Sequence, residues 1–450
     1  MNNRPRLPFC FVLLLLLWRV ARVHADEDTV GWLREYYRED GDRMKVDTDT
    51  ANMDMGLTSN LRLNVNVVAD TISGSTPTGA PPQTQWVFPT FNNYYQASYG
   101  QAYGALYGQF TNANQIYVDN NLETYQQMTN QAAQFAHAGA PTVASNNATA
   151  SYHSLTNSPN YRKNTVPLTY LHDYRNAVSI GLPFTYGRQI FSPSFAWSEE
   201  SDYVSRAFAF NESLYFNNKN TMLTFGWACN MDQVRDDTRT WVDKHSDDFL
   251  LGLVQIMGKN SYLTVNGTVG NETGYLADPY RGVMLISTNA LQQNPNDASM
   301  YPEVRPRHRT KGIMDISWTQ YIPPLHGSLE SDYRYFEDTW GTFAQTVDMH
   351  WHQKIGKKLV ASFGFRYYYQ TAADFYAVDF TRLPDVYSAD YRCSEFETFG
   401  YSLKLSYRVL RFLSLDASYM RYTMRGLDGV TSQSAYPQAN VYSLGMRLWF

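Results

Sequence analysis

The strongest constraint in this sequence is an alternation of apolar and polar residues with a period of two, which recurs from near residue 29 to the C-terminus. Successive side chains of a β-strand point to opposite faces, so this period predicts strands with one apolar face each. Segments 61–70 and 359–369 follow it, and segment 401–408 shows it most clearly. There, one face holds Tyr401, Leu403, Leu405 and Tyr407, and the other holds Ser402, Lys404, Ser406 and Arg408.

The spacing of these segments separates a membrane barrel from a soluble β-sandwich, which also alternates. Segments are expected near 29–38, 43–57, 61–73, 166–185, 189–199, 203–216, 220–233, 247–258, 260–273, 311–322, 328–338, 342–355, 358–370, 391–408, 412–424 and 439–450. Every second connection is short, whereas the alternate ones include long loops at 74–165, 234–246, 274–310, 371–390 and 425–438. This sorting is typical of outer-membrane barrels, with turns in the periplasm and loops outside. We predict an all-β fold: a transmembrane antiparallel up-and-down β-barrel of about 16 strands (range roughly 14–18).

The last predicted strand carries an independent signal. Tyr442, Leu444, Met446 and Leu448 alternate back from the terminal Phe450, a pattern similar to the assembly signal of outer-membrane barrels. It predicts recognition by the barrel-assembly machinery. Trp318, Trp351, Tyr407 and Trp449 fall near segment ends on predicted apolar faces, as the aromatic girdles of lipid-embedded barrels require. Outer-membrane lipids are therefore an expected partner.

The N-terminus predicts export. Residues 1–25 have the layout of a secretory signal peptide, with Arg4 and Arg6 before an apolar run and Val23-His24-Ala25 before an acidic stretch. Cleavage after Ala25 is expected, which leaves 26–450 as the barrel; Arg19 and Arg22 keep an uncleaved anchor as the alternative. No other segment approaches the run of about 20 apolar residues that a helical membrane bundle needs. The expected location is the bacterial outer membrane, reached through the periplasm.

Composition excludes other classes of partner and chemistry. The net charge of −5 supplies no basic surface for nucleic acid. The 3 cysteines, Cys10, Cys229 and Cys393, cannot build a disulfide framework. Cys229 and Cys393 are expected in strands on almost opposite sides of the barrel, too far apart for a bond.

Four stretches of the chain resemble one bacterial protein family. They are 70–81 (Asp-Thr-Ile-Ser-Gly-Ser-Thr-Pro-Thr-Gly-Ala-Pro), Ser198 to Tyr203, Asn217 to Thr221, and Asp390-Tyr391-Arg392. The family is an outer-membrane one, catalogued as the domain of unknown function with the number three thousand five hundred and seventy. The resemblance implies a barrel over nearly all of the mature chain except an insertion, and implies no activity.

That insertion has a different period. Residues 83–160 are rich in Tyr, Asn and Gln. Their only Asp, Glu, Lys or Arg residues are Asp119 and Glu123. Tyrosines at every fourth position from Tyr95 to Tyr107, and apolar residues at spacings of three or four from Leu122 to Phe135, predict two helices near 92–110 and 121–138. We expect them to lie in an extracellular loop or to plug the lumen. The alternatives are simple packing of the helix pair and an aromatic platform for sugar-like ligands.

The polar faces predict the lumen lining. Candidate residues of both charge signs are Asp315, Glu330, Asp332, Arg334, Asp348, His350, His352, Arg366, Lys404, Arg408 and Asp416. Opposed charges suit a hydrated pore. Asp348, His350 and His352 share one face and offer a metal-ligand set for Zn²⁺ or Cu²⁺. Their spacing along a strand is wider than a tight chelate prefers, so ordinary lumen polarity is the favoured explanation.

Segment 232–248 concentrates aspartates in a predicted loop that can attract Ca²⁺ or bridge lipid headgroups, or simply be solvated. His245 in that loop, and His172 with Asp173, are the His/acid pairs kept as catalytic candidates. No nucleophile elbow, HExxH, phosphate loop or dinucleotide fingerprint occurs, so no catalytic residues are assigned and no cofactor is expected.

The function that follows is a passive or weakly selective pore for small hydrophilic solutes, because about sixteen strands leave a water-filled lumen. The alternative is a closed barrel that serves as a surface-binding scaffold or an outer-membrane hydrolase.

Overall fold

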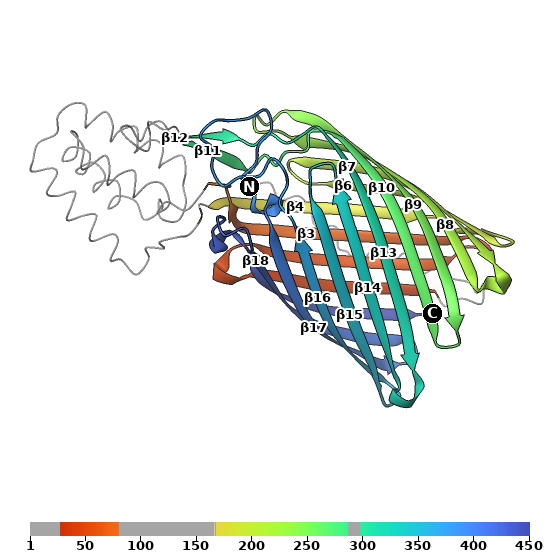
Figure 1. The fold of residues 1–450 in the computed structure, drawn as a ribbon. Helices are drawn as coiled ribbons and strands as arrows, with labels where there is room; N and C mark the ends of the chain where they lie inside the picture. Colours follow the sequence, from red (N-terminus) through yellow and green to blue (C-terminus); the bar gives the residue numbers. More distant parts are fainter. Residues whose placement is uncertain (1–27, 81–165, 167, 287–297) are drawn as a thin grey trace, which may run out of the picture.

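The computed structural model describes residues 28–80, 166, 168–286 and 298–450. Figure 1 shows long strands running side by side as an inclined barrel, with a small hairpin, β11 and β12, near one end. The barrel strands are β1 (Thr29–Glu39), β2 (Lys45–Gly56), β3 (Arg62–Pro77), β4 (Leu168–Gly181), β5 (Phe184–Tyr186), β6 (Gln189–Glu199), β7 (Tyr203–Phe216), β8 (Thr221–Arg235), β9 (Trp241–Gly258), β10 (Ser261–Gly274), β13 (His308–Ile322), β14 (Gly327–Asp338), β15 (Phe343–Ile355), β16 (Leu359–Gln370), β17 (Phe396–Leu410), β18 (Leu413–Gly426) and β19 (Gln438–Trp449). The hairpin strands are β11 (Gly282–Ile286) and β12 (Ala298–Pro302).

The sheet closes on itself. β1 pairs with β2 on one side and with β19 on the other, antiparallel and in unbroken register from Thr29 opposite Trp449 to Glu39 opposite Ala439. β5 continues β4 beyond a break at Leu182 and Pro183, where proline has no N–H for the ladder, and both pieces pair with β6. The described residues therefore form a closed antiparallel barrel of 16 strands, as the alternation predicts.

The register assigns the two faces of the wall. Directly paired residues share a face, and Phe225, Leu251, Phe363, Leu403 and Leu444 are exposed apolar side chains of one face. The opposite face of β14 to β16 lines a cavity together with loop residues that fold over the barrel end. The first face is therefore the outside, and its exposed apolar side chains are what contact with lipid requires.

Three of the four predicted girdle residues follow the same rule. Trp318, Trp351 and Tyr407 lie on the outer face, as expected. The expectation for Trp449 is wrong: it lies on the face opposite to Leu448 and Phe450, and the guanidinium of Arg408 stacks on its ring at 5.0 Å. Tyr442, Leu444 and Met446 of the C-terminal pattern are exposed on the outer face.

Short turns and long loops lie at opposite ends. The turns after β2, β7, β9, β13, β15 and β17 gather at one end with both described termini, where Phe450 N–H donates to Asp28. The described parts of the loops after β10, β16 and β18 lie at the other end, where β3 also ends (Figure 1). The expected sorting of connections is confirmed for the described parts of the loops after β10, β16 and β18, but the connection after β8 is a short turn and not the long loop expected at 234–246.

Three expected boundaries change. The strand expected at 391–408 begins only at Phe396, because Asp390 caps a 3₁₀ turn at Tyr391–Cys393. β9 begins at Trp241, inside the expected loop 234–246, and the expected loop 274–310 contains the β11–β12 hairpin.

The helices expected near 92–110 and 121–138 fall outside the described residues, so the structure gives no support to the helical insertion. The part of the chain that the structure describes contains strands and short 3₁₀ turns but no α-helix. It includes no helix long and apolar enough to span a membrane.

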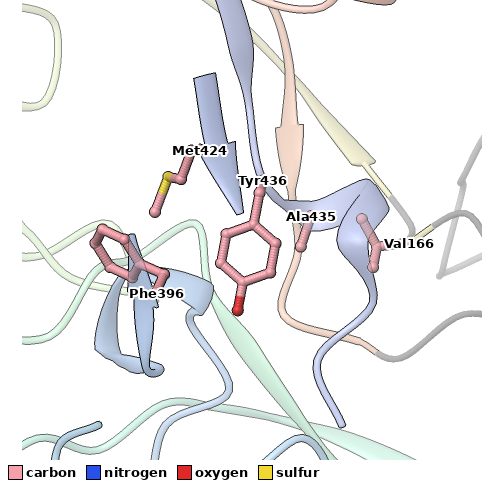
Figure 2. Close-up of a cluster of buried hydrophobic side chains, with 5 residues drawn as sticks. All are labelled: Val166, Phe396, Met424, Ala435 and Tyr436. Carbon is pink, nitrogen blue, oxygen red and sulfur yellow. The ribbon is translucent and has the colours of Figure 1, made fainter. Parts of the chain in front are cut away.

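One apolar cluster fixes the last loop to the wall. Figure 2 shows the Tyr436 ring between Phe396 and Met424 on one side and Ala435 on the other, with Val166 nearby. The Tyr436 hydroxyl lies 2.7 Å from Ser394 Oγ. A Cβ on Gly426 would lie 2.3 Å from this ring, so glycine is required at the end of β18.

Gly74 offers a test of the close backbone contacts near the loop end. Its φ is +128°, and a Cβ there would lie 2.0 Å from the carbonyl oxygen of Arg43. We expect Gly74→Ala to destabilise the barrel by about 2 kcal/mol or more, because both the conformation and the contact are unfavourable. Heat-dependent gel mobility of the folded barrel in detergent measures this.

Gly41→Ala is the matched control, because Gly41 also has a positive φ, +72°, but has no atom within 4 Å of its Cβ position. Equal thermal midpoints for Gly74→Ala and Gly41→Ala would contradict the predicted contact.

Candidate functional site

The loops at one end of the barrel fold into a packed cap. We define the cap as the described residues of 275–307, 371–395 and 427–437. Its backbone is joined by hydrogen bonds between distant segments, such as Val304 to Tyr387 in both directions and Phe380 N–H to Met284. Val283, Met284 and Ser388 are fully buried. These loops are therefore structured, with small cores of their own.

Asp390 is the centre of the cap. It is fully buried, and its Oδ2 lies 2.7 Å from Arg305 Nη2, 2.8 Å from Arg392 Nε and 3.7 Å from Arg281 Nε. Three guanidinium groups from three separate parts of the chain thus converge on one carboxylate. Burial alone would raise the pKa of Asp390, but the charges of Arg392, Arg281 and Arg305 hold it well below its ordinary value.

Glu303 and Asp278 extend this network. Glu303 contacts Arg305 Nε at 2.8 Å and accepts a hydrogen bond from the Ser388 hydroxyl. Asp278 accepts from Arg392 Nη2. Burial raises the pKa of Glu303, with the Arg305 charge opposing this and the Asp390 charge adding to it. The carboxylates and guanidinium groups therefore depend on one another, since a buried charge without a partner is strongly unfavourable.

Three of the stretches that carry the family resemblance meet at this network. Arg281 donates to Thr76 Oγ1 at 2.8 Å, and Gly282 N–H donates to the Thr78 carbonyl at 2.7 Å, both within the stretch 70–81. Tyr280 donates to Asp202 of the second stretch. Asp390-Tyr391-Arg392 supplies the central carboxylate. The fourth stretch, 217–221, lies at the opposite end, in a turn with positive φ at Asn217, Asn218 and Lys219.

A cavity of about 390 Å³ lies between the cap and the inner wall of β13 to β16. The side chains that line it include 5 arginines, three aromatic rings and no carboxylate. The arginines are Arg305, Arg309, Arg334, Arg366 and Arg392, and the rings are Phe336, Trp340 and Tyr368. Most of these guanidinium groups form ion pairs with carboxylates that do not line the cavity. For example, Arg309 Nη2 lies 2.6 Å from Asp338 Oδ2. The surface of the cavity is therefore cationic and aromatic.

Two of these arginines are placed to meet a ligand. Among the described residues, Arg334 has no recorded hydrogen bond or ion pair, and register places it opposite Asp315 on the inner face. Arg366 contacts Asp348 at 3.0 Å, but its side chain is 51% exposed. Guanidinium groups bind carboxylates and phosphates through parallel hydrogen bonds. An anionic solute in the cavity would meet both.

The structure places the lumen candidates on the inner face. Register joins Asp315 to Arg334, Asp332 to Asp348, Asp348 to Arg366, and Glu330 to His350. Lys404, Arg408 and Asp416 lie farther from the cap, and Asp416 accepts from Ser406 Oγ. Arg334 and Arg366 alone among these candidates line the cavity. Sequence reasoning missed Arg305, Arg309 and Arg392, because they lie in or next to loops without periodicity.

The expected metal trio divides between two carboxylates. His350 Nε2 lies 2.9 Å from Asp348, whereas His352 Nε2 lies 3.3 Å from Glu330. The rings are stacked with centroids 6.0 Å apart. Among the described residues, the groups of three that bring ligand atoms within 4.8 Å of one another are Cys229, His245 and Asp247, and Asp173, Glu200 and Asp202. Metal binding by Asp348, His350 and His352 stays a prediction.

The acidic loop and one His/acid pair are corrected. Only Asp236 and Asp237 lie in the turn between β8 and β9, while Asp232, Asp243, Asp247 and Asp248 lie in strands and alternate between the two faces. They cannot act as one Ca²⁺ loop. His172 lies on the outer face beside Tyr174, and Asp173 on the inner face, so this pair does not meet. Cys229 and Cys393 are both free, as expected.

A family model described as "Protein of unknown function (DUF3570)" matches residues 18–242 and 235–442. The chain belongs to this family. The resemblance on the four stretches is thereby confirmed, and the DUF3570 cap now has a described geometry. A search of curated proteins finds no match.

Solved structures with a similar fold are outer-membrane proteins. A "Bacterial polysaccharide outer membrane secretin" is 6% identical with a TM-score of 0.43, over 95% of this chain and 100% of that chain. OpdK of Pseudomonas aeruginosa is 7% identical with a TM-score of 0.37, over 94% and 99%. OccK5 (OpdH) of the same organism is 7% identical with a TM-score of 0.39, over 94% and 98%. Likeness this distant carries no inference about the DUF3570 chain, whose closed antiparallel barrel is established by its own strand pairing.

Asp390→Asn tests the cap network. The variant leaves three buried guanidinium groups without their shared counter-charge, which costs about 3–5 kcal/mol in comparable buried pairs. We expect the cap to open locally while the barrel stays folded. Maleimide labelling reports this: Cys393 is buried among cap residues, and its thiol pKa is raised by burial to about 11, so it should label only in the variant.

Asp385→Asn is the control, because Asp385 is exposed in the same loop. Equal Cys393 labelling in the two variants would contradict the role of Asp390.

The native cap should also loosen on acidification. Because the pKa of Asp390 is depressed in the folded chain, its ionised form stabilises the cap above the pKa of an unfolded aspartate, about 4. This stabilisation is lost as the pH falls below that value toward the folded-state pKa. Hydrogen exchange in 371–395 should show this in the native chain and not in Asp390→Asn.

Proposed function

We propose that this chain is a pore of the bacterial outer membrane that passes small hydrophilic solutes and favours those carrying a carboxylate or phosphate group. The observation that carries the proposal is the arginine-lined cavity between the cap and the inner wall. A solute crossing the barrel from the loop end passes this region. The aromatic rings of Phe336, Trp340 and Tyr368 offer apolar contact beside the guanidinium groups.

The rest of the barrel supports a hydrated path. Below the cavity, the inner face carries Asp332, Glu330, His350 and Lys404 in close succession, with charges of both signs. Polar groups facing each other across a barrel of 16 strands favour water in the lumen. Selection by charge then belongs to the cavity, where guanidinium groups dominate, rather than to the whole lumen.

The proposed location of the chain is the bacterial outer membrane. An apolar outer face with Trp318 and Tyr407 near strand ends suits a lipid bilayer. The expected signal at 1–25 would bring the chain to the periplasm, and the alternating residues up to Phe450 would direct its insertion by the barrel-assembly machinery. Outer-membrane lipids and small anionic solutes are the proposed partners.

The cap also favours a second candidate. Asp390, Ser388 and Val283 are fully buried, so the cap is packed tightly enough to restrict the outer entrance. If the cap closes the lumen, the barrel would act as a surface-binding scaffold or hydrolase. Planar bilayer recordings separate the two, because only a pore gives discrete conductance steps.

Arg334→Gln tests selection by the cavity. Removing one guanidinium group without an ion-pair partner should lower the anion-to-cation permeability ratio by about threefold, because a charge in a narrow low-dielectric site has a large effect on ion entry. The reversal potential in a salt gradient measures this ratio.

Lys404→Gln is the matched control, because it removes one positive charge from the inner face outside the cavity. Its permeability ratio should change much less than that of Arg334→Gln. Equal shifts would mean that net lumen charge sets selectivity, and a silent, correctly folded native barrel would replace the pore by the closed scaffold.

A further inference from the structure

A second cluster lies on the outer face of the barrel, away from the cavity. The register of β8 and β9 places Cys229 opposite Asp247 and Met231 opposite His245. These residues share the face that carries Trp227 and Phe249. One ligand atom from each of Cys229, His245 and Asp247 lies within 4.8 Å of the other two.

The position of the cluster exposes its His245 and Asp247 side chains on the outer face, whereas Cys229 is the most buried of the three. Along β8 the outer face carries Leu223, Phe225 and Trp227 before Cys229, and along β9 the apolar residues end at Phe249 before Asp247. The cluster thus begins where the apolar belt ends, toward the loop end of the barrel. The side chains of His245 and Asp247 are 45% and 31% exposed.

Neighbouring groups hold the carboxylate in position. Trp227 Nε1 donates to Asp247 Oδ1 at 3.1 Å, while His245 Nε2 lies 2.7 Å from Asp247 Oδ2. The indole thus orients the carboxylate, as outer hydrogen bonds orient ligating carboxylates in metal sites. A metal ion would replace the hydrogen bond that now joins Asp247 to His245. The Cys229 side chain also hydrogen-bonds to Asp247, so the thiol and the imidazole converge on one carboxylate.

The donor set selects the class of ion. Ca²⁺ and Mg²⁺ prefer oxygen ligands alone, whereas thiolate, imidazole and carboxylate together suit Zn²⁺. Three protein ligands leave a fourth tetrahedral position for water or an external group. Binding would release the proton of the Cys229 thiol, since the thiolate is the ligand.

We propose that Cys229, His245 and Asp247 form a Zn²⁺-binding site on the outer rim of the barrel. The site is separate from the cavity beneath the cap, so the test of Zn²⁺ binding does not depend on whether the barrel is a pore.

Protection of a thiol tests the site in the full-length folded barrel in detergent. Cys229 should react with a maleimide, and peptide mapping distinguishes it from buried Cys393. We expect Zn²⁺ to slow the labelling of Cys229 about tenfold or more, the chelator EDTA to restore it, and one Zn²⁺ to bind per chain. Heat-dependent gel mobility verifies that each preparation is folded.

Variants make the test specific. His245→Ala and Asp247→Asn should lose most of the protection while keeping a reactive Cys229. Asp243→Asn, two residues beyond His245 on the same face of β9, should keep it. Absence of protection in the native chain, equal protection by Ca²⁺, or full protection in folded His245→Ala would each overturn the proposal.

Discussion

The structure depends on satisfying every backbone hydrogen bond of a sheet whose outer face is apolar. In hydrocarbon an unpaired N–H or C=O costs several kcal/mol, so an open edge is not tolerated. The pairing of β1 with β19 removes both edges at once. It also places the first and last described residues together, since Asp28 and Phe450 exchange backbone hydrogen bonds. Closure then fixes which side chains face lipid and which face the lumen.

Closure also determines where chemistry can occur. The wall strands present charges in fixed rows, whereas the loop end brings charged side chains from separate loops together. Asp390 gathers Arg281, Arg305 and Arg392. Of these, Arg305 and Arg392 also line the cavity. A buried carboxylate shared by three guanidinium groups is a rigid support, because moving any one member leaves another charge unpaired. The cap is therefore structurally joined to the surface that would select a solute.

Much of the wall could be predicted from the sequence, because a strand in a lipid-facing barrel must alternate over its whole length. Segment 401–408 is an example, since its two faces are assigned by period alone. Segments near the loops were less predictable. Trp241 and Asp243 belong to β9, although the surrounding aspartates suggest a loop. The strands here extend beyond the apolar belt, where polar outer faces are stable.

The cap and the outer-rim cluster could not be predicted, and the reasons differ. Asp390 and Arg305 are far apart in sequence and have no periodic signal, so only the folded loops bring them together. Cys229 and Asp247 lie on regular strands, but their meeting depends on a register that a one-residue shift would destroy.

The central claim is that a closed wall separates lipid from a hydrated lumen. A spin-label scan of residues 403–406 in lipid vesicles tests this claim most directly. The scan uses a chain in which Cys229 and Cys393 are replaced by serine. We expect labels at Leu403 and Leu405 to collide with oxygen dissolved in lipid, and labels at Lys404 and Ser406 to collide with a water-soluble nickel complex. Equal access of the nickel complex to all four positions would contradict it.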